Sequence, residues 1–166
     1  ILLAERPIKI GDYIQVGNQE GAVKKISVRS TEIETIHRQS VIIPNATLIT
    51  DPVSNWMHLD KSCRVDIPVG VDYGTDTELL RSTLLDVAKA HRGVLKQPPP
   101  VVHFAGFGES SLDFQLRVFL RDVRSRIGWS SELRFAILAA LRDAGISIPF
   151  PQRDIHVMER APEAGG

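Results

Sequence analysis

Four arginines that stand close together in the chain could bind an anion. They form the one local concentration of basic residues in the sequence: Arg117, Arg121, Arg124 and Arg126. Guanidinium groups recognise phosphate and carboxylate through paired hydrogen bonds, so an anion-facing surface is one interpretation. The other interpretation, which we favour, is a solvated strand end whose charge Asp122 offsets.

The residue types that most often carry catalysis or hold metals form no recognisable pattern. No two histidines have i,i+4 spacing among positions 37, 58, 91, 103 and 156. Glu32 and Glu34 share one face of a predicted strand and could act as an acid–base pair, but a solvated face is the favoured interpretation. Gly106-Phe107-Gly108 lacks the third glycine of a dinucleotide-binding loop and precedes a strand. We therefore expect no enzyme activity, no catalytic residue, no metal and no cofactor.

Composition places the chain among folded proteins and argues against a nucleic-acid binder. The 166 residues are 43% hydrophobic, with 20 basic and 20 acidic residues. A nucleic-acid binder usually carries a basic excess because phosphate neutralisation supplies much of its affinity. The single cysteine, Cys63, excludes an intrachain disulfide and is expected to be a buried apolar residue. No run approaches the roughly 18 apolar residues of a membrane span. The start at Ile1-Leu2-Leu3-Ala4, without Met, suggests the cut end of something longer.

The first part of the sequence reads as short strands joined by tight turns, with no helix. A bulge is expected near Lys24-Lys25, where the apolar spacing departs from strict alternation. Pro44-Asn45 predicts a corner at which one strand ends and another begins, with Asn45 closing the turn through its own side chain. The pattern predicts a small, strongly bent barrel. The expected strands cover residues 13–16, 20–28, 31–36, 40–43 and the stretch after the corner.

The second part alternates strands with helices in the order βαββαβ, which predicts a ferredoxin-like domain. Thr75 and Glu78 fit a capping box for the first helix, and Ser130 or Ser131 is expected to cap the second. The expected strands are 63–71, 101–107, 111–120 and 155–158, and the helices are 75–92 and 130–144. An RNA-recognition sheet would expose several aromatic residues on its central strands, whereas the clearest strand exposes only Phe119.

Several spaced motifs together resemble the cytosolic region of the small-conductance mechanosensitive ion channel family. They are the stretches from Arg6 to Asp12 and from Gly21 to Ile33, then Ile42-Ile43-Pro44-Asn45 with Leu48-Ile49, then Asn55-Trp56, and finally the stretch from Ala144 to Gln152. The resemblance covers about residues 5–160 in the right order. We expect its motif positions to be structural: Gly21, Arg29, Thr31, Pro44, Asn45, Asn55, Trp56, Gly145, Pro149 and Pro151.

The resemblance implies an α+β chain of two domains. An Sm-like β domain would occupy residues 1–58, with residues 1–5 the end of a removed pore helix. A ferredoxin-like α/β domain would occupy residues 59–160, and residues 161–166 would form a frayed tail. The chain would lack the membrane helices, which carry the pore and tension sensor. The family's C-terminal barrel strand is also expected to be missing.

The implied function is the cytoplasmic vestibule of an inner-membrane channel that releases ions and small osmolytes on hypo-osmotic shock. Its partner would be itself, as a homo-oligomeric ring, typically a heptamer. It would touch the membrane only through the absent N-terminal helices and would bind no nucleic acid. Solutes would pass through side openings near residues 57–72, whose individual lining residues the sequence does not assign. One alternative is a free-standing Sm-like module that binds RNA or protein; another, a small enzyme, has no catalytic constellation behind it.

Overall fold

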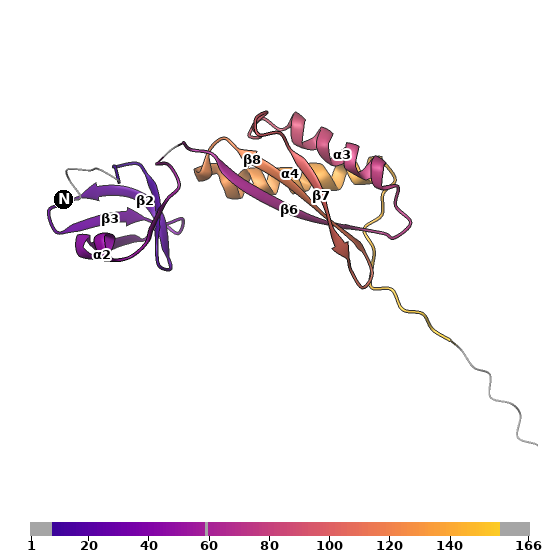
Figure 1. Cartoon of the computed structure of the whole chain (residues 1–166), viewed down its shortest axis with the longest axis horizontal. Helices are drawn as coiled ribbons and strands as arrows, with labels where there is room; N and C mark the ends of the chain where they lie inside the picture. Colours follow the sequence, from indigo (N-terminus) through magenta and orange to yellow (C-terminus); the bar gives the residue numbers. More distant parts are fainter. Residues whose placement is uncertain (1–7, 59, 157–166) are drawn as a thin grey trace, which may run out of the picture.

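Two separate antiparallel sheets organise the chain, and each builds one lobe (Figure 1). The structure is a computed structural model that describes residues 8–58 and 60–156. We call residues 8–58 the β lobe and residues 60–156 the α/β lobe. The predicted α+β class, with a small β unit before a mixed one, is confirmed.

The β lobe is a bent five-stranded sheet with the strand order β4-β3-β2-β1-β5. Its core consists of apolar side chains from alternate strand positions, among them Ile14, Val23 and Ile33. The predicted bulge is confirmed, since the β2–β3 register shifts between Val23 and Lys25. The elements are β1 (Tyr13–Val16), β2 (Gln19–Ile26), β3 (Ser30–Glu34), β4 (Ser40–Pro44), α2 (Asn45–Thr50) and β5 (Val53–Asn55).

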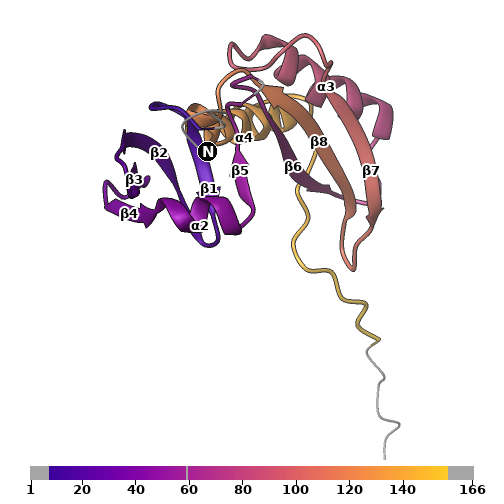
Figure 2. The same cartoon turned by 60° about the vertical axis from the view of Figure 1, so that its left-hand side comes forward.

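The prediction of a strand after the Pro44-Asn45 corner is wrong, because the helix α2 begins there. β4 and β5 are the two edge strands of the sheet, so the chain must cross from one edge to the other between them. A short helix makes this crossing (Figure 2). It buries only Leu48, at 8% exposure, while the neighbouring Ile49 is 64% exposed. One buried position cannot distinguish a helical period from a strand period, so the pattern was ambiguous.

Asn45 holds the corner by a different route from the one predicted. Its side chain does not cap its own helix. Instead, its Oδ1 accepts a hydrogen bond from the Thr31 hydroxyl at 2.8 Å, and its Nδ2 donates to the carbonyl oxygens of Ser27 and Val28 at 2.9 and 3.2 Å. The backbone N–H of Asn45 donates to the carbonyl of Arg29 at 2.9 Å. Asn45 therefore fastens the start of α2 to the turn between β2 and β3.

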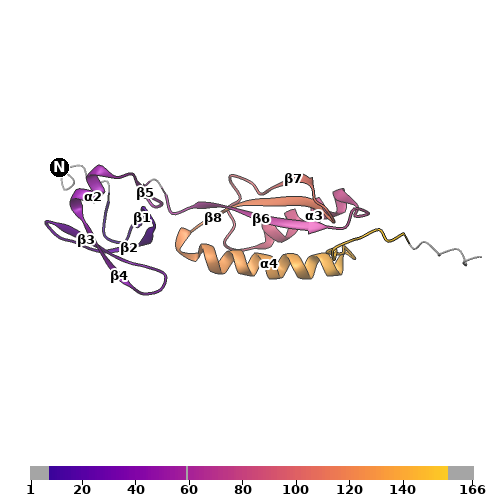
Figure 3. The ribbon, with the colours of Figure 1, turned by 90° about the horizontal axis from the view of Figure 1, so that it is seen from below.

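The α/β lobe is a three-stranded sheet, in the order β6-β8-β7, with both long helices on one face. Figure 3 shows α4 running along that side of the sheet. β8 alternates buried and half-buried residues over its whole length, as its sequence predicts. Its buried Leu116, Val118 and Leu120 pack in one core with Leu84 and Leu133 of the helices. The elements are β6 (Cys63–Val71), α3 (Thr77–Ala90), β7 (Val101–Phe107), β8 (Leu112–Leu120), a 3₁₀ turn η1 (Val123–Ser125) and α4 (Arg126–Asp143).

Both predicted helix starts need correction. The N-cap of α3 is Asp76, not Thr75, because the Asp76 carboxylate accepts hydrogen bonds from the backbone N–H groups of Glu78 and Leu79 at 3.0 and 3.1 Å. α4 begins at Arg126, directly after η1, and not at Ser130. Ser130 is 7% exposed and lies inside the helix. A serine at a helical core position resembles a cap in sequence, so the pattern was misleading.

The predicted strand over residues 155–158 does not form at Ile155 or His156, which have no regular structure. The other two positions lie outside the described residues, as do residues 1–5 and 161–166. Within the described residues the second lobe is therefore βαββα. The segment after α4 first contacts the end of the sheet, where Ser147 accepts a hydrogen bond from Asp72, and then runs away from it (Figure 1).

Replacing Gly21 by alanine should destabilise the protein. A methyl group at Gly21 would lie 2.4 Å from the carbonyl oxygen of Glu34, a backbone atom that cannot move independently of β3. Such overpacking typically costs about 1–3 kcal/mol. Urea unfolding would measure it. Gly106→Ala is the matched control, because nothing lies within 4 Å of the added methyl group. Equal midpoints for the two variants would show that β2 and β3 are not this closely packed.

Asn45→Ala should lower the free energy of unfolding by about 1–2 kcal/mol, because it removes three side-chain hydrogen bonds, one of them from the buried Thr31 hydroxyl. The Thr31 hydroxyl, in a side chain only 2% exposed, would lose its acceptor. Thr50→Ala, at the exposed end of the same helix, is the control and should change little. A denaturation midpoint for Asn45→Ala that equals the parent's would mean that other contacts hold the corner.

Candidate functional site

The two lobes meet at a junction built from the β1–β2 hairpin, the chain after β5 and the start of α4. Tyr13, Ala22 and Trp56 of the β lobe pack against the core of the α/β lobe, which includes Val123 just before α4. The backbone N–H of Trp56 donates to the carbonyl of Tyr13 at 2.9 Å, which holds the indole beside β1. An apolar seam therefore joins the lobes.

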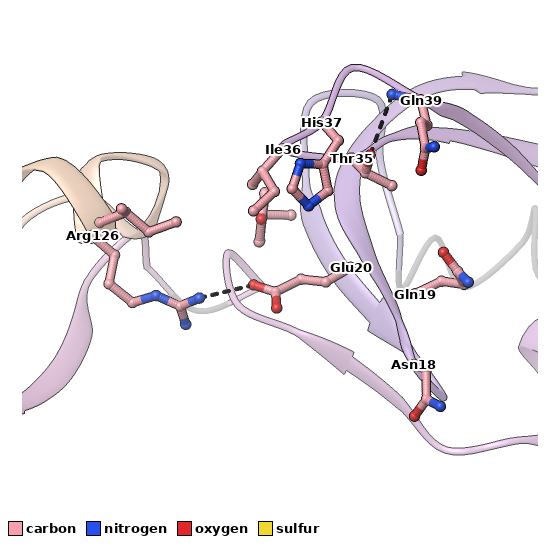
Figure 4. A pocket seen from close by; sticks show the side chains of 10 residues that line it. Asn18, Gln19, Glu20, Thr35, Ile36, His37, Gln39 and Arg126 are labelled. Atoms are coloured by element: carbon pink, nitrogen blue, oxygen red, sulfur yellow. Dashed lines mark hydrogen bonds and ion pairs between the residues drawn. The ribbon is translucent and has the colours of Figure 1, made fainter.

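Arg126 adds a polar contact to this seam. One guanidinium nitrogen, Nη2, lies 3.1 Å from Oε1 of Glu20 on β2, as Figure 4 shows. The guanidinium carbon lies 5.5 Å from the centre of the Trp56 ring, a cation–π distance. The Glu20 and Arg126 side chains are each 31% exposed, so water reaches the pair but does not surround it. Arg126 thus binds two residues of the other lobe at once.

Tyr13 shares this environment. Burial raises the pKa of its phenol above the ordinary value, and so do the negative charge of Glu20 and a hydrogen bond to it. The positive charge of Arg126 opposes these effects. The phenol therefore stays protonated at neutral pH and can donate to the carboxylate that Arg126 also binds.

Two open hollows in the surface adjoin Arg126, and the first of them also adjoins Glu20. One, of about 220 Å3, lies between the β1–β2 hairpin, the β3–β4 turn and the start of α4; Asn18, His37 and Gln39 are among the side chains that border it (Figure 4). The other, of about 270 Å3, is bordered by Glu34, Arg38 and Arg124 as well as by Arg126. Polar and charged groups of both signs face these spaces. The lobes thus touch at the seam and leave open surface hollows beside it.

Asn55 organises the β-lobe end of the junction. Its Nδ2 donates to the Asp12 carboxylate at 2.8 Å, and its Oδ1 accepts from the backbone N–H of Met57 at 3.0 Å. Asp12 also accepts a hydrogen bond from the backbone N–H of Lys9 at 2.9 Å. These contacts hold the entry to β1 against the exit from β5. Trp56, the next residue, is positioned by this network.

The remaining motif residues lie at backbone features away from the junction. Arg29 and Pro44 are exposed, and their backbones take part in the β2–β3 turn and the start of α2. Gly145 has φ of +69°, which suits glycine, and its N–H donates to the carbonyl of Arg142 at the end of α4. Pro149 and Pro151 lie in the extended segment that follows. The predicted motif residues therefore divide between the corner, the junction and the end of α4.

The four clustered arginines are all engaged within the chain. Arg117 binds the Asp66 carboxylate through two hydrogen bonds, of 2.8 and 3.2 Å, and this contact holds the pKa of Asp66 below its usual value. Arg121 donates to the carbonyl of Arg92, and Arg124 forms an ion pair with Asp122 at 2.6 Å. With Arg126 bound to Glu20, the arrangement does not favour the anion-facing interpretation.

The described part of the chain contains no group of three or more His, Cys, Asp or Glu residues that could hold a metal ion. Glu32, one of the two carboxylates considered for acid–base chemistry, accepts a hydrogen bond from the exposed Ser40 hydroxyl. Glu34 lies 3.6 Å from the ammonium of Lys24. Both carboxylates therefore serve contacts between strands.

Sequence reasoning identified Asn55 and Trp56 but missed Glu20 and its pairing with Arg126. The two residues are 106 positions apart, and each is an ordinary charged residue in its own element. Only the packing of the lobes brings them together, so no local pattern could have revealed the pair. Among residues 8–58 and 60–156, no helix has the length and hydrophobicity required to cross a bilayer.

Two family models match the chain in order. The β-domain model of mechanosensitive ion channels matches residues 1–58, and the C-terminal model of the mechanosensitive ion channel MscS matches residues 65–148. The mechanosensitive channel MscK of Escherichia coli is 40% identical over 157 residues, which are 95% of this chain and 14% of that protein. The miniconductance channel MscM of the same organism is 31% identical over 151 residues, again 14% of its length.

Solved structures agree with these matches. The closed-state crystal structure of Helicobacter pylori MscS superposes with a TM-score of 0.86 at 29% identity, covering 96% of this chain and 63% of that one. Arabidopsis thaliana MSL1 gives a TM-score of 0.72 at 15% identity over 90% of this chain and 55% of that one, and shows the shared fold alone. The chain spans only part of each relative. Because the C-terminal model covers just over half of it and the β-domain model precedes that match in order, this chain belongs to the mechanosensitive ion channel MscS family.

Proposed function

We propose that this chain is one subunit's share of the cytoplasmic vestibule of a mechanosensitive channel that releases ions and small osmolytes on hypo-osmotic shock. The observation that carries the proposal is the ordered match of two MscS-family models to the two lobes. The division falls between residues 58 and 59, with the β domain nearer the membrane. The pore and tension sensor belong to membrane helices outside this chain.

The partner in this proposal is a ring of identical subunits, a heptamer by analogy with the family. One observation supports self-association. Within the described residues, β4 and β5 each pair with one neighbour only, so the β lobe presents two strand edges. An unpaired edge carries free N–H and C=O groups that another strand can satisfy. Head-to-tail pairing that repeats around an axis closes a ring.

The solute openings lie beside the lobe junction, near residues 57–72. There the chain passes from Trp56 into β6. The two open hollows beside Arg126 belong to the same junction, although residues outside this stretch border them. The charges on this stretch are of both signs: Asp66 lies 3.6 Å from Arg64 and is also bound by Arg117. Mixed charge favours passage of both anions and cations over strong selection for one sign.

The motif residues have a structural role in this proposal. Asn45 and Thr31 secure the corner of the β lobe, and Asn55 positions Trp56 at the junction. None of them carries chemistry. They maintain the shape of the vestibule wall. Their replacement should therefore reduce the abundance or the assembly of the channel before it changes ion conduction.

Osmotic survival tests the proposal. The full-length gene product that contains this chain should restore survival of hypo-osmotic shock to bacteria that lack their own tension-gated channels. The controls are a version that ends before residue 63 and the empty vector. Membrane fractions establish that the full-length and shortened proteins are present. Full-length protein in the membrane with survival equal to that of the empty vector would contradict the proposal. A gene that encodes no stretch of about 20 apolar residues before Ile1 would also contradict the proposal.

A further inference from the structure

We propose that Arg126 is a latch that fixes the angle between the β lobe and the α/β lobe through its simultaneous contacts with Glu20 and Trp56. This inference concerns the chain itself and does not depend on the channel function proposed above. It follows from where each of the three side chains is anchored, and from the open hollows that adjoin the Arg126 guanidinium next to the apolar seam.

Arg126 moves with the α/β lobe. It is the first residue of α4, and the η1 turn before it is capped by the Asp122 side chain. Further along α4, Leu133, Ile137 and Leu141 are buried in the core of that lobe. The base of the guanidinium is therefore fixed by an 18-residue helix and not by a mobile loop.

Both partners of Arg126 move with the β lobe. Glu20 lies on β2 and pairs with Gln15 of β1. Trp56 directly follows β5 and is held by its backbone hydrogen bond to Tyr13. Every contact that the Arg126 guanidinium makes with these two residues therefore crosses from one lobe to the other.

Apart from the apolar seam of Tyr13, Ala22 and Trp56, the junction beside Arg126 is loosely filled. Two open surface hollows, of about 220 and 270 Å3, adjoin the Arg126 side chain, so close packing there does not fix the lobes in place of the guanidinium contacts. The chain between Trp56 and β6 has no helix or strand in its described residues. Lys61 already belongs to the α/β side, because its carbonyl accepts from the N–H of Val123 at 2.8 Å. Trp56 and Lys61, only five positions apart, are therefore held by different lobes.

The two contacts of Arg126 contribute differently. An ion pair with a hydrogen bond is directional, so the 3.1 Å contact with Glu20 fixes the direction in which the lobes face each other. A cation over an aromatic ring tolerates sliding across the face, so Trp56 mainly fixes the distance. Loss of Glu20 should therefore loosen the angle, and loss of Arg126 should loosen both angle and distance.

Pulsed electron-paramagnetic-resonance distances between spin labels test the latch on the 166-residue chain. Labels at Thr50→Cys on α2 and Lys89→Cys on α3, both exposed positions, report the lobe-to-lobe distance. Cys63 is 5% exposed, and burial raises the pKa of its thiol, so it should remain unlabelled. Dilution of labelled chains with unlabelled ones isolates distances within one molecule.

In the parent chain we expect one narrow distance distribution. Arg126→Gln should broaden it by about twofold, with Glu20→Gln intermediate because the cation–π contact persists. Arg92→Gln is the matched control: it removes the same charge from a pair with Glu132, at 3.3 Å, that lies wholly within the α/β lobe. This control should leave the distribution unchanged.

Exchanging the two charges tests whether the ion pair itself causes the narrow distance distribution. Glu20→Arg and Arg126→Glu should each broaden the distribution, and the double variant should be narrower than either because it restores an ion pair between the lobes. Circular dichroism establishes whether each variant is folded. If the Arg126 variants do not fold, the distance distribution of Glu20→Gln tests the proposal. Distributions for Glu20→Gln and Arg126→Gln that superpose on the parent's would overturn the proposal. Equal broadening by Arg92→Gln would overturn it too.

Discussion

The contact between Arg126 and the β lobe is the constraint on which the shape of the whole chain depends. Each lobe has its own sheet and its own set of buried side chains. What relates one lobe to the other is a seam of Tyr13, Ala22 and Trp56, with one guanidinium bound to Glu20 and lying over the Trp56 ring. In the proposed ring of identical subunits, this relation would have to be the same in every copy.

The family's sequence motifs acquire physical meaning around that constraint. Asn45 fastens the start of α2 to the β2–β3 turn, and α2 carries the chain between the two edge strands of the β sheet. Gly21 lets β2 approach the end of β3 more closely than a side chain would allow. Asn55 then holds the exit from β5 beside Asp12, which sets Trp56 in place. The motif residues shape the β lobe so that it presents one face to the α/β lobe.

Much of this fold could be predicted from the sequence, for reasons that differ between elements. β8 was predictable because five apolar residues alternate along it and one face is fully buried. The helix α2 was not, because a single buried Leu48 carries no period and Pro-Asn is as compatible with a turn between strands as with a helix start. The start of α4 was misplaced because a buried Ser130 resembles a cap. Asp76 was passed over because Thr75, three residues before Glu78, fits the capping box whereas Asp76 precedes Leu79 at that spacing.

The candidate site was harder to predict than the fold. Asn55 and Trp56 were identified through the resemblance to a family, and the structure supplies their contacts. Glu20 and Arg126 could not be paired, since nothing local relates two charged residues 106 positions apart. The arginine cluster shows the converse error, because proximity in sequence suggested a shared surface. In the fold Arg117, Arg124 and Arg126 each bind a different carboxylate.

The most direct test of the account is a cryo-electron-microscopy reconstruction of the full-length protein that contains this chain. The account predicts a closed ring in which the copies contact one another through their β lobes and side openings lie next to the lobe junctions. Copies without a ring, or a ring in which neighbouring subunits cover every junction so that no opening remains, would contradict it.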